Sequence, residues 1–445
     1  MSRFQIETSY PECIPMDDSQ FAMISSIFTV GGLLGALCAG PLSNVYGRLP
    51  AMRLSTLFYI AGSGIEAVSV SIPLMATGRL LSGIGAGASL VIVPLYIAEA
   101  APPRERGMFG VMTQISINIG IVITQTLGYM LNKPGQWRII LAVGGAIGLA
   151  QGIGLFFIPE SPAWTASNKN PRTALHTLRR IRGKDADIDE EIQAWGVDIP
   201  TGLAVEAETL LPNTVAPRPG SSASKASKKS IENIGFFEVA RHPLYRPAII
   251  VVVGVMFSQQ FTGINSVMMY SVSLLTELFH ESSALLTIMI SLVNLFTTVL
   301  CAPLSDKLGR KTCLILSISG MGISSTALAF SLLFEIKILS AISILCFTAA
   351  FAVGLGPIPF ILASELVGQE ARGATQSWAL SANWIFTFIV AQFFPIINDA
   401  LQGRGLVYFI FAGMALISLL FVSWRVPETL GKRDADEVWG RVRRD

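Results

Sequence analysis

The chain is poor in charged residues, in histidine and in usefully spaced cysteine. Asp, Glu, Lys and Arg make up 14% of its 445 residues, whereas soluble domains carry about 25%. The three histidines are scattered, and the five cysteines have neither metal-ligand spacing nor the pattern of a disulfide framework. A soluble globular chain and a His- or Cys-based metal site are therefore not expected.

Other functional classes are disfavoured by what is missing. The sequence contains no nucleophile–base pair, phosphate-binding loop or metal cluster, so we expect no enzyme activity and no cofactor. A net charge of +2 is too small to predict a nucleic-acid partner. No basic stretch followed by a short apolar core opens the chain, so no signal peptide is expected.

Long apolar runs are what the sequence has in abundance, and 51% of its residues are hydrophobic. About 20 mostly apolar residues suffice to cross a bilayer as a helix. Eleven segments qualify: 21–43, 50–71, 76–97, 108–131, 138–158, 247–274, 284–304, 312–333, 338–362, 374–398 and 405–426. We therefore predict an all-α, multi-pass membrane protein surrounded by lipid.

Basic residues orient the chain, because Lys and Arg concentrate on the cytoplasmic side of membrane proteins. They gather near 48–53, 104–106 and 307–311, all on one side if the spans alternate. The predicted organisation is an extracytoplasmic segment 1–20, a five-span bundle 21–158, a cytoplasmic loop 159–246 with short helices, a six-span bundle 247–426 and a cytoplasmic tail 427–445. Within the loop, 201–230 has the composition of a flexible linker.

Two turns in distant parts of the chain are nearly identical. Gly40–Arg48 reads GPLSNVYGR and Ala302–Arg310 reads APLSDKLGR, each between two apolar runs. Such an internal repeat predicts two related helix bundles, an organisation typical of transporters. The first copy carries Asn44 where the second carries Asp306.

These turns, together with further motifs in order, resemble the major facilitator superfamily and its sugar porter family. The other motifs are Gly78–Gly83, Pro94–Glu99 with Arg106-Gly107, Pro159–Pro162 and Pro427–Gly431. The resemblance implies a major facilitator fold with two pseudo-symmetric bundles and twelve spans in its complete form. Since we count eleven spans, we expect the chain to lack the family's first helix. Asn44 and Ala163 depart from the residues usual in the family, which have Asp and a basic residue there.

Three amides interrupt an apolar span. Gln259, Gln260 and Asn265 must find hydrogen-bond partners, because hydrocarbon supplies none. Either they bind an uncharged, hydroxylated substrate or they connect neighbouring helices. They fit one broad helical face only if the helix is loosened near Gly263.

The resemblance assigns these three amides to hexose binding and extends the predicted site. The other substrate-binding residues that it implies are Gln114, Asn294, Phe360, Asn383 and Trp384. Gln125 is a further candidate that simple helix packing would explain equally well. Phe360 stands where the family often has Trp, and Tyr270 is the expected extracellular lid.

Two further sets of residues are predicted to act in the conformational cycle. Gly356, Pro357 and Pro359 interrupt an apolar span, and the prolines are expected to break the helix ladder and form a gate. Charged residues gather at cytoplasmic helix ends, either as solvated interfacial charge or, as the resemblance implies, as a salt-bridge network that closes the outward-facing state. They are Arg48, Glu99, Arg106, Glu160, Asp306, Arg310, Glu365 and Arg372.

The function predicted from these features is transport of a monosaccharide, above all a hexose, by alternating access. Facilitated diffusion and proton symport both stay open, and Glu66 is the acid found within a span. A transporter-like nutrient sensor and a truncated inactive transporter are the alternatives. The expected partners are a sugar, the bilayer and, under symport, protons. The sequence does not distinguish the plasma membrane from the vacuolar membrane.

Overall fold

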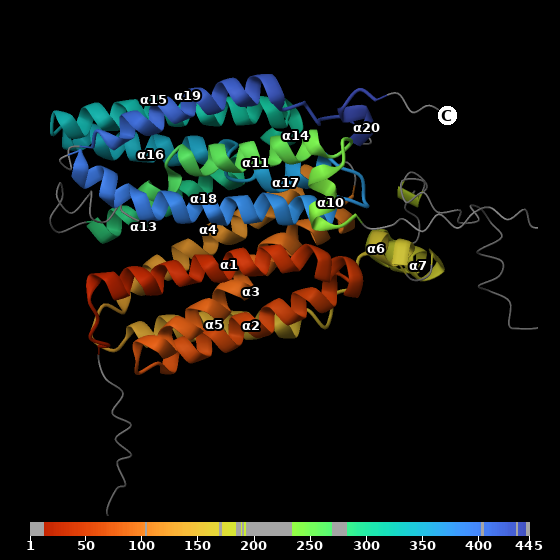
Figure 1. Ribbon diagram of the computed structural model, residues 1–445, viewed down its shortest axis with the longest axis horizontal. Helices are drawn as coiled ribbons and strands as arrows, with labels where there is room; N and C mark the ends of the chain where they lie inside the picture. The colour runs from red at the N-terminus through yellow and green to blue at the C-terminus, as the bar shows by residue number, and fades with distance from the viewer. Residues whose placement is uncertain are drawn as a thin grey trace, which may run out of the picture.

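The described part of the chain is helical throughout. The computed structural model describes residues 13–102, 105–168, 171–183, 188, 191–192, 234–268, 283–401, 405–432 and 435–441, and these ranges contain no strand. The long helices lie in two groups, one above the other in Figure 1. The predicted all-α architecture of two bundles is confirmed.

The first bundle comes from the N-terminal half of the chain. Its helices are α1 (Asp18–Tyr46), α2 (Arg48–Val68), α3 (Ile72–Ala100), α4 (Arg106–Met130) and α5 (Trp137–Gly154). Glycines let α1 and α3 approach closely: a Cβ on Gly83 would overlap the backbone of Phe28, and one on Gly87 would overlap that of Gly32. Small residues at such contacts hold membrane helices together by close packing, because lipid provides no hydrophobic drive between helices.

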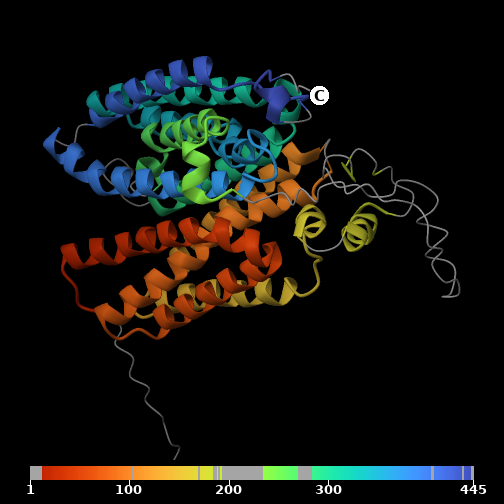
Figure 2. The same ribbon diagram turned by 45° about the vertical axis from the view of Figure 1, so that its right-hand side comes forward.

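The second bundle has more pieces, since two of its spans are broken. Its elements are α11 (Arg246–Phe261), α13 (Ser283–Cys301), α14 (Leu304–Leu308), α15 (Arg310–Leu333), α16 (Lys337–Val353), α17 (Ile358–Glu365), α18 (Arg372–Ala400) and α19 (Val407–Arg425). Figure 2 shows α1 of the first bundle running along α18 of the second. The interior between the bundles is therefore lined by helices from both halves.

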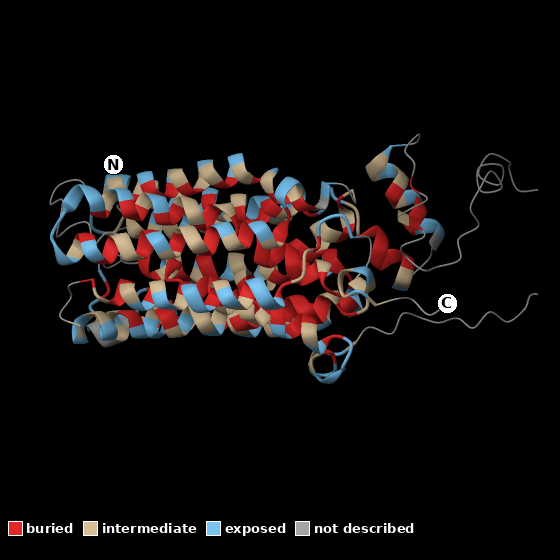
Figure 3. Ribbon diagram, turned by 90° about the horizontal axis from the view of Figure 1, so that it is seen from above, coloured by how far each residue is buried: buried red, intermediate tan, exposed pale blue. Residues whose placement is uncertain are grey.

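The membrane character of the chain is confirmed, whereas the count of eleven spans is not matched in full. Within the described ranges, nine helical stretches are long and apolar enough to cross a bilayer. A tenth, Leu285–Cys301, is shorter, and α2, at the remaining predicted position, is a 21-residue helix that does not meet the same criterion. Large apolar side chains are exposed, as expected for a surface in contact with lipid: Ile323, Ile338 and Leu420 are 72%, 73% and 64% exposed. Exposed and buried positions alternate along the long helices (Figure 3).

Short helices gather at one end of the bundles, which we call the cytoplasmic end because it carries the basic turns. They are α6 (Pro162–Asn168), α7 (Pro171–Arg182), α10 (Phe236–Arg241) and α20 (Ala435–Val438). α6 and α7 share a small buried core that includes Ala166, Ala174 and Leu178. The predicted linker 201–230 lies outside the described residues.

Candidate functional site

The span that carries the predicted amides is broken at its glycine. Thr262 and Gly263 interrupt the helix between Phe261 and Ile264. Gly263 has a φ of +97°, a backbone conformation that residues other than glycine adopt only at an energetic cost. A Cβ at this position would also lie 2.6 Å from the ring of Phe411. The predicted loosening near Gly263 is confirmed.

The break brings amides together in the membrane interior. Asn265 Nδ2 donates to Gln260 Oε1 at 2.5 Å, and Gln260 Nε2 donates to Gln259 Oε1 at 3.3 Å. From α18, Asn383 Nδ2 donates to the same Gln259 oxygen at 2.6 Å, while Thr387 Oγ1 lies 3.4 Å from Asn265 Nδ2. We call these five residues the amide cluster. It is a continuous polar patch shared by α11, its continuation and α18.

The gap between α16 and α17, residues 354–357, explains why the amide nitrogen of Gln259 is already hydrogen-bonded. Pro359 has no N–H to donate to the carbonyl four residues earlier, that of Leu355. Gln259 Nε2 donates to this Leu355 oxygen instead, at 2.6 Å. Where no water is present, a freed carbonyl needs such a partner. The predicted break of the helix ladder at Pro357 and Pro359 is confirmed, and the Gln259 nitrogen stabilises it.

A second polar group joins the two halves of the chain. Gln114 Nε2 on α4 donates to Asn118 Oδ1 at 3.0 Å. Asn118 Nδ2 reaches α13, where it lies 2.9 Å from Thr298 Oγ1 and 3.3 Å from Asn294 Oδ1. All four side chains are buried. Ser291 on α13 also donates to Gln125 Oε1 at 2.5 Å, which supports the helix-packing explanation for Gln125.

The second group lies against the amide cluster. A Cβ on Gly356 would be 3.5 Å from the amide carbon of Gln114, and the Gly356 carbonyl lies 3.4 Å from Gln259 Nε2. Gln114 and Gln259 therefore flank the same break from opposite halves of the chain.

The two predicted aromatic residues occupy different places. The Trp384 indole packs edge-on against Phe28 of α1, with ring centroids 5.9 Å apart, and its buried Nε1–H has no acceptor within the described part of the chain. Phe360 is 6% exposed and lines a small pocket between α3, α4 and α17 with Pro94 and Gly110. Trp384 thus offers a free donor in the interior, whereas Phe360 lies on the cytoplasmic side of the proline break.

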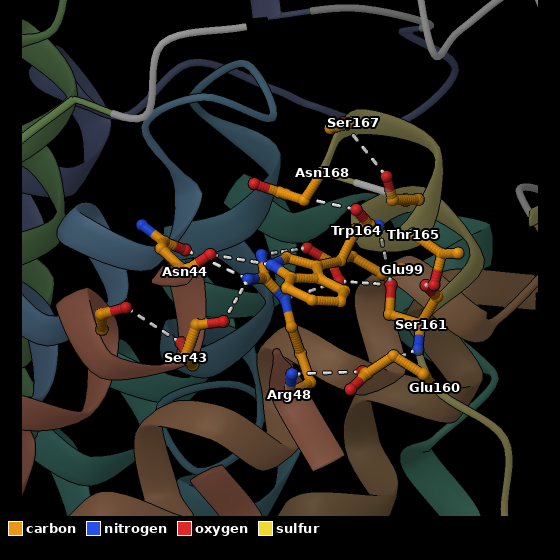
Figure 4. Close-up of polar contacts among 12 residues, drawn as sticks. Ser43, Asn44, Arg48, Glu99, Glu160, Ser161, Trp164, Thr165, Ser167 and Asn168 are labelled. Atoms are coloured by element: carbon orange, nitrogen blue, oxygen red, sulfur yellow. Dashed lines mark hydrogen bonds and ion pairs between the residues drawn. The ribbon is translucent and has the colours of Figure 1, made fainter. Parts of the chain in front are cut away.

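At the cytoplasmic end, an ion pair closes the first bundle (Figure 4). Arg48 donates to Glu99 through Nε at 2.9 Å and through Nη2 at 2.6 Å, with both side chains buried. Ser161 Oγ donates to Glu99 Oε2 at 2.6 Å, and Arg48 Nη1 reaches Asn44 Oδ1 at 3.1 Å. The bidentate geometry suits a planar guanidinium and fixes the ends of α2 and α3 together.

The second bundle repeats this arrangement. Arg310 donates to Glu365 through Nε at 3.2 Å and Nη2 at 2.9 Å, and Thr429 Oγ1 donates to Glu365 Oε2 at 2.5 Å. Arg310 Nη1 also pairs with Asp306 Oδ1 at 3.0 Å. Each contact has its counterpart in the first bundle, so the repeat seen in the sequence extends to atomic contacts.

The repeat includes a capping carboxylate in each half. Glu160 accepts hydrogen bonds from the backbone N–H groups of Arg48 and Leu49, both at 3.1 Å. Glu428 accepts from Arg310 N at 2.8 Å and from Lys311 N at 3.1 Å. A carboxylate at a helix N-terminus satisfies free N–H groups and is favoured by the helix dipole. The two glutamates thereby position the starts of α2 and α15.

Contacts between the halves are of another kind. The Asp306 carboxylate lies at the first turn of α4, where a Cβ on Gly107 would overlap it. In the mirrored place, a Cβ on Gly373 at the start of α18 would lie 2.6 Å from Asn44 Oδ1. The repeated turn of each half therefore docks on a helix N-terminus of the other half, and these contacts close the cytoplasmic end.

The ion pairs, in contrast, stay within one bundle each. Removing one partner of a buried pair typically costs roughly 3–5 kcal/mol, so we expect both pairs to persist while the bundles move. Arg372 begins α18, and its buried Nε has no hydrogen-bond acceptor among the residues that the structure describes. Arg106 begins α4, but its side chain and the whole of Tyr270 lie outside the described residues.

Comparison with known proteins agrees with this architecture. The sequence model of the family described as "Sugar (and other) transporter" matches residues 1–436. The chain belongs to the sugar transporter family. Members of this family are transporters and not enzymes.

Individual relatives of this sugar transporter cover most of its length. A probable metabolite transport protein of Saccharomyces cerevisiae is 32% identical, over 96% of this chain and 84% of the relative. The facilitated glucose transporter member 3 of solute carrier family 2 from Rattus norvegicus is 30% identical, over 94% and 81%. The solved structure of the proton:xylose symporter XylE bound to 6-bromo-6-deoxy-D-glucose superposes with a TM-score of 0.78 at 23% identity, over 95% and 89% of the two chains. The last similarity establishes the major facilitator fold.

The structure adds residues that were not predicted as site residues, although three of them belong to the motifs Pro159–Pro162 and Pro427–Gly431. They are Asn118, Thr387, Ser161, Glu428 and Thr429. Asn118 was detectable in the sequence as a second amide one helical turn from Gln114 on an apolar helix. Glu428 was detectable because it follows the second bundle as Glu160 follows the first. No sequence pattern predicts Thr387 as a partner of Asn265. In the described ranges, no group of three or more His, Cys, Asp or Glu side chains is placed to hold a metal ion. The expected absence of a first helix stays a prediction.

Proposed function

We propose that this chain transports a monosaccharide, above all a hexose, across a membrane by alternating access. The observation that carries the proposal is the amide cluster, which lies in the interior between two pseudo-symmetric bundles. Amides both donate and accept, as the hydroxyls of a sugar do. The cluster contains no ionisable side chain, so an uncharged substrate fits it better than an ion.

Neighbouring groups support a sugar in particular. Trp384 Nε1–H, which has no acceptor among the described residues, offers a donor, and its indole offers an apolar face of the kind that packs against a sugar ring. Relatives that carry glucose or xylose in their names support the same substrate class. Gln114, Asn118 and Asn294 extend the polar surface from the first bundle to the second.

In the proposed cycle, the helices bend at their breaks and the contacts at the cytoplasmic end separate. The described arrangement has its cytoplasmic end closed by the docked turns around Asn44 and Asp306. Opening this end requires those two contacts to separate while each bundle keeps its own ion pair. The breaks at Gly263 and at residues 354–357 are where α11 and the α16–α17 pair can bend without losing a complete helical ladder.

Transport down the sugar gradient alone needs no titratable group beyond the amide cluster. A second candidate, proton-coupled uptake, is favoured by Glu66, which is 3% exposed on α2. Its carboxylate accepts a hydrogen bond from Ser82 Oγ at 2.5 Å and lies 3.5 Å from Arg79 Nε. Buried ionisable groups of this kind serve as proton relays in many transporters. An imposed proton gradient, applied to the wild type and to E66Q, separates the two modes: gradient-stimulated uptake that E66Q loses would establish symport.

The central experiment is uptake of labelled sugars by the full chain in proteoliposomes. The panel contains D-glucose, D-fructose, D-xylose, maltose and sorbitol, with L-glucose as the stereochemical control. We expect saturable uptake of at least one D-monosaccharide and none of L-glucose. If no sugar of the panel moves, transport is refuted. Sugar-induced thermal stabilisation without uptake would then support a sensor, and its absence an inactive protein.

A further inference from the structure

One side chain in the described structure is buried with both of its polar atoms unpaired. Gln376 of α18 is 1% exposed, and neither its amide nitrogen nor its amide oxygen has a hydrogen-bond partner among the described residues. A buried amide without partners destabilises a folded protein, because it has lost water and gained nothing in return. Gln376 is therefore not explained as a connection between helices.

Its position on α18 relates it to the amide cluster. Successive residues of an α-helix are rotated by about 100°, so residues seven apart project from nearly the same side. Gln376 thus shares its face with Asn383, and this face continues to Thr387. Asn383 contacts Gln259 of α11, and Thr387 contacts Asn265 of the continuation of α11. Seven residues correspond to about 10 Å along the helix, which places Gln376 that far towards the cytoplasmic end.

The same face leads on to the cytoplasmic surface. Arg372 lies one turn below Gln376, at the start of α18, and its buried Nε also has no partner in the described part of the chain. Between Gln376 and Asn383, the buried side chains of Ala379 and Leu380 are apolar. Gln376 is accordingly a separate polar position on this helix face, between the amide cluster and the cytoplasmic end, and not an edge of the cluster.

We propose that Gln376 is a second hydroxyl-binding position, which receives the sugar on the cytoplasmic part of its route. Its ligand class is an uncharged polyhydroxylated molecule, whose hydroxyls match one amide donor and one amide acceptor. The position is closed in the described arrangement and becomes available when the docked turns separate. This inference rests on the proposed function and adds to it a binding step beneath the amide cluster.

The test is Q376M, since methionine keeps the unbranched shape of glutamine and has no strong hydrogen-bonding group. Half-saturation is measured from each face, in sealed right-side-out and inside-out vesicles, with labelled D-glucose or whichever panel sugar the wild type carries best. We expect the cytoplasmic half-saturation concentration to rise at least about five-fold, because methionine removes at least one neutral hydrogen bond to the sugar. The value at the opposite face should change less than about two-fold, because the sugar is proposed to meet Gln376 only on the cytoplasmic part of its route.

The matched control is S381A. Ser381 is also buried on α18, and its hydroxyl has no partner within the described ranges, but a separation of five residues turns it well away from the face of Gln376. S381A should alter neither half-saturation value. The melting temperature of sugar-free Q376M should equal or exceed that of the wild type, because the substitution removes no hydrogen bond.

Two results would overturn the inference. One is a Q376M protein whose half-saturation is unchanged at the cytoplasmic face, or changed equally at both faces. The other is a lowered melting temperature, which would show that the amide is bonded in the free protein and has a structural role. A wild type that moves no sugar refutes the proposed function itself, whereas a transporting wild type with unaltered Q376M refutes only this inference.

Discussion

The two docked turns differ by one charge, and this difference can be measured. Asp306 presents a carboxylate to the N-terminus of α4, whereas Asn44 presents a neutral amide to the N-terminus of α18. A negative charge at a helix N-terminus contributes typically 0.3–1 kcal/mol, and up to about 2 kcal/mol when partly buried. Since Asp306 is 25% exposed, we take about 1 kcal/mol for each site. We therefore expect N44D to stabilise the closed cytoplasmic end and D306N to destabilise it.

The magnitude follows from this free energy. About 1 kcal/mol changes the ratio of closed to open molecules roughly five-fold. Because Asp306 also pairs with Arg310, D306N loses a second contact, and its effect should be at least as large as that of N44D. The double variant N44D/D306N restores one charged and one neutral turn, so its open fraction should lie between those of the single variants.

The assay is alkylation of a cysteine placed at Ser364, in a background whose native cysteines are replaced. Ser364 is 6% exposed and lines the small pocket between α3, α4 and α17, so it reacts when the cytoplasmic end opens. When opening and closing are faster than alkylation, the rate is proportional to the open fraction. Equal alkylation rates in the wild type, N44D, D306N and the double variant would refute the conclusion that these turns hold the cytoplasmic end closed. A rise in N44D would refute the sign of the charge effect.

Three further predictions concern single contacts. Q260A removes the acceptor of Asn265 and one donor of the amide cluster, so the half-saturation concentration for sugar should rise more than about ten-fold. Q125A, at a helix-packing contact, should change this concentration less than about two-fold. Equal effects of the two variants would exclude the site assignment. P359A restores an N–H for the Leu355 carbonyl and should raise the melting temperature while slowing transport; unchanged turnover would show that the break is not a gate. Tyr245 donates to Glu370 at 2.8 Å, and burial, with help from this bond, raises the pKa of Tyr245 above its usual value. The stabilisation is fully present below the unfolded pKa of about 10, so Y245F should lower stability by about 1 kcal/mol equally between about pH 6 and 9; a loss that varies across this range would contradict the reasoning.

Much of the site was visible in the sequence because it depends on local features. Gln259, Gln260 and Asn265 stood out as amides in an apolar run, and the loosening at Gly263 was required for them to share a face. Pro357 and Pro359 predicted a helix break by removing donors, whatever surrounds them. Asn118 and Thr387 were missed because their partners come from distant helices.

The charged network shows the same division. The sequence identified Arg48, Glu99, Arg310 and Glu365, and their common end of the molecule followed from span alternation. It did not reveal that each pair stays within one bundle, or that Asn44 and Asp306 make the contacts between bundles. Pairing depends on which helix ends meet, and the repeat alone leaves both pairings possible.

By itself, the sequence determined the membrane environment, the two related bundles and the family, because run length, repeat and motif order are properties of the linear chain. Only the tertiary structure decided which polar groups are available to a ligand. The Gln259 nitrogen donates to the carbonyl that Pro359 leaves free, while Trp384 Nε1 and the amide of Gln376 have no partner among the residues that the structure describes. A hydrogen bond in the membrane interior forms with whatever a neighbouring helix presents, and that neighbour is set by packing.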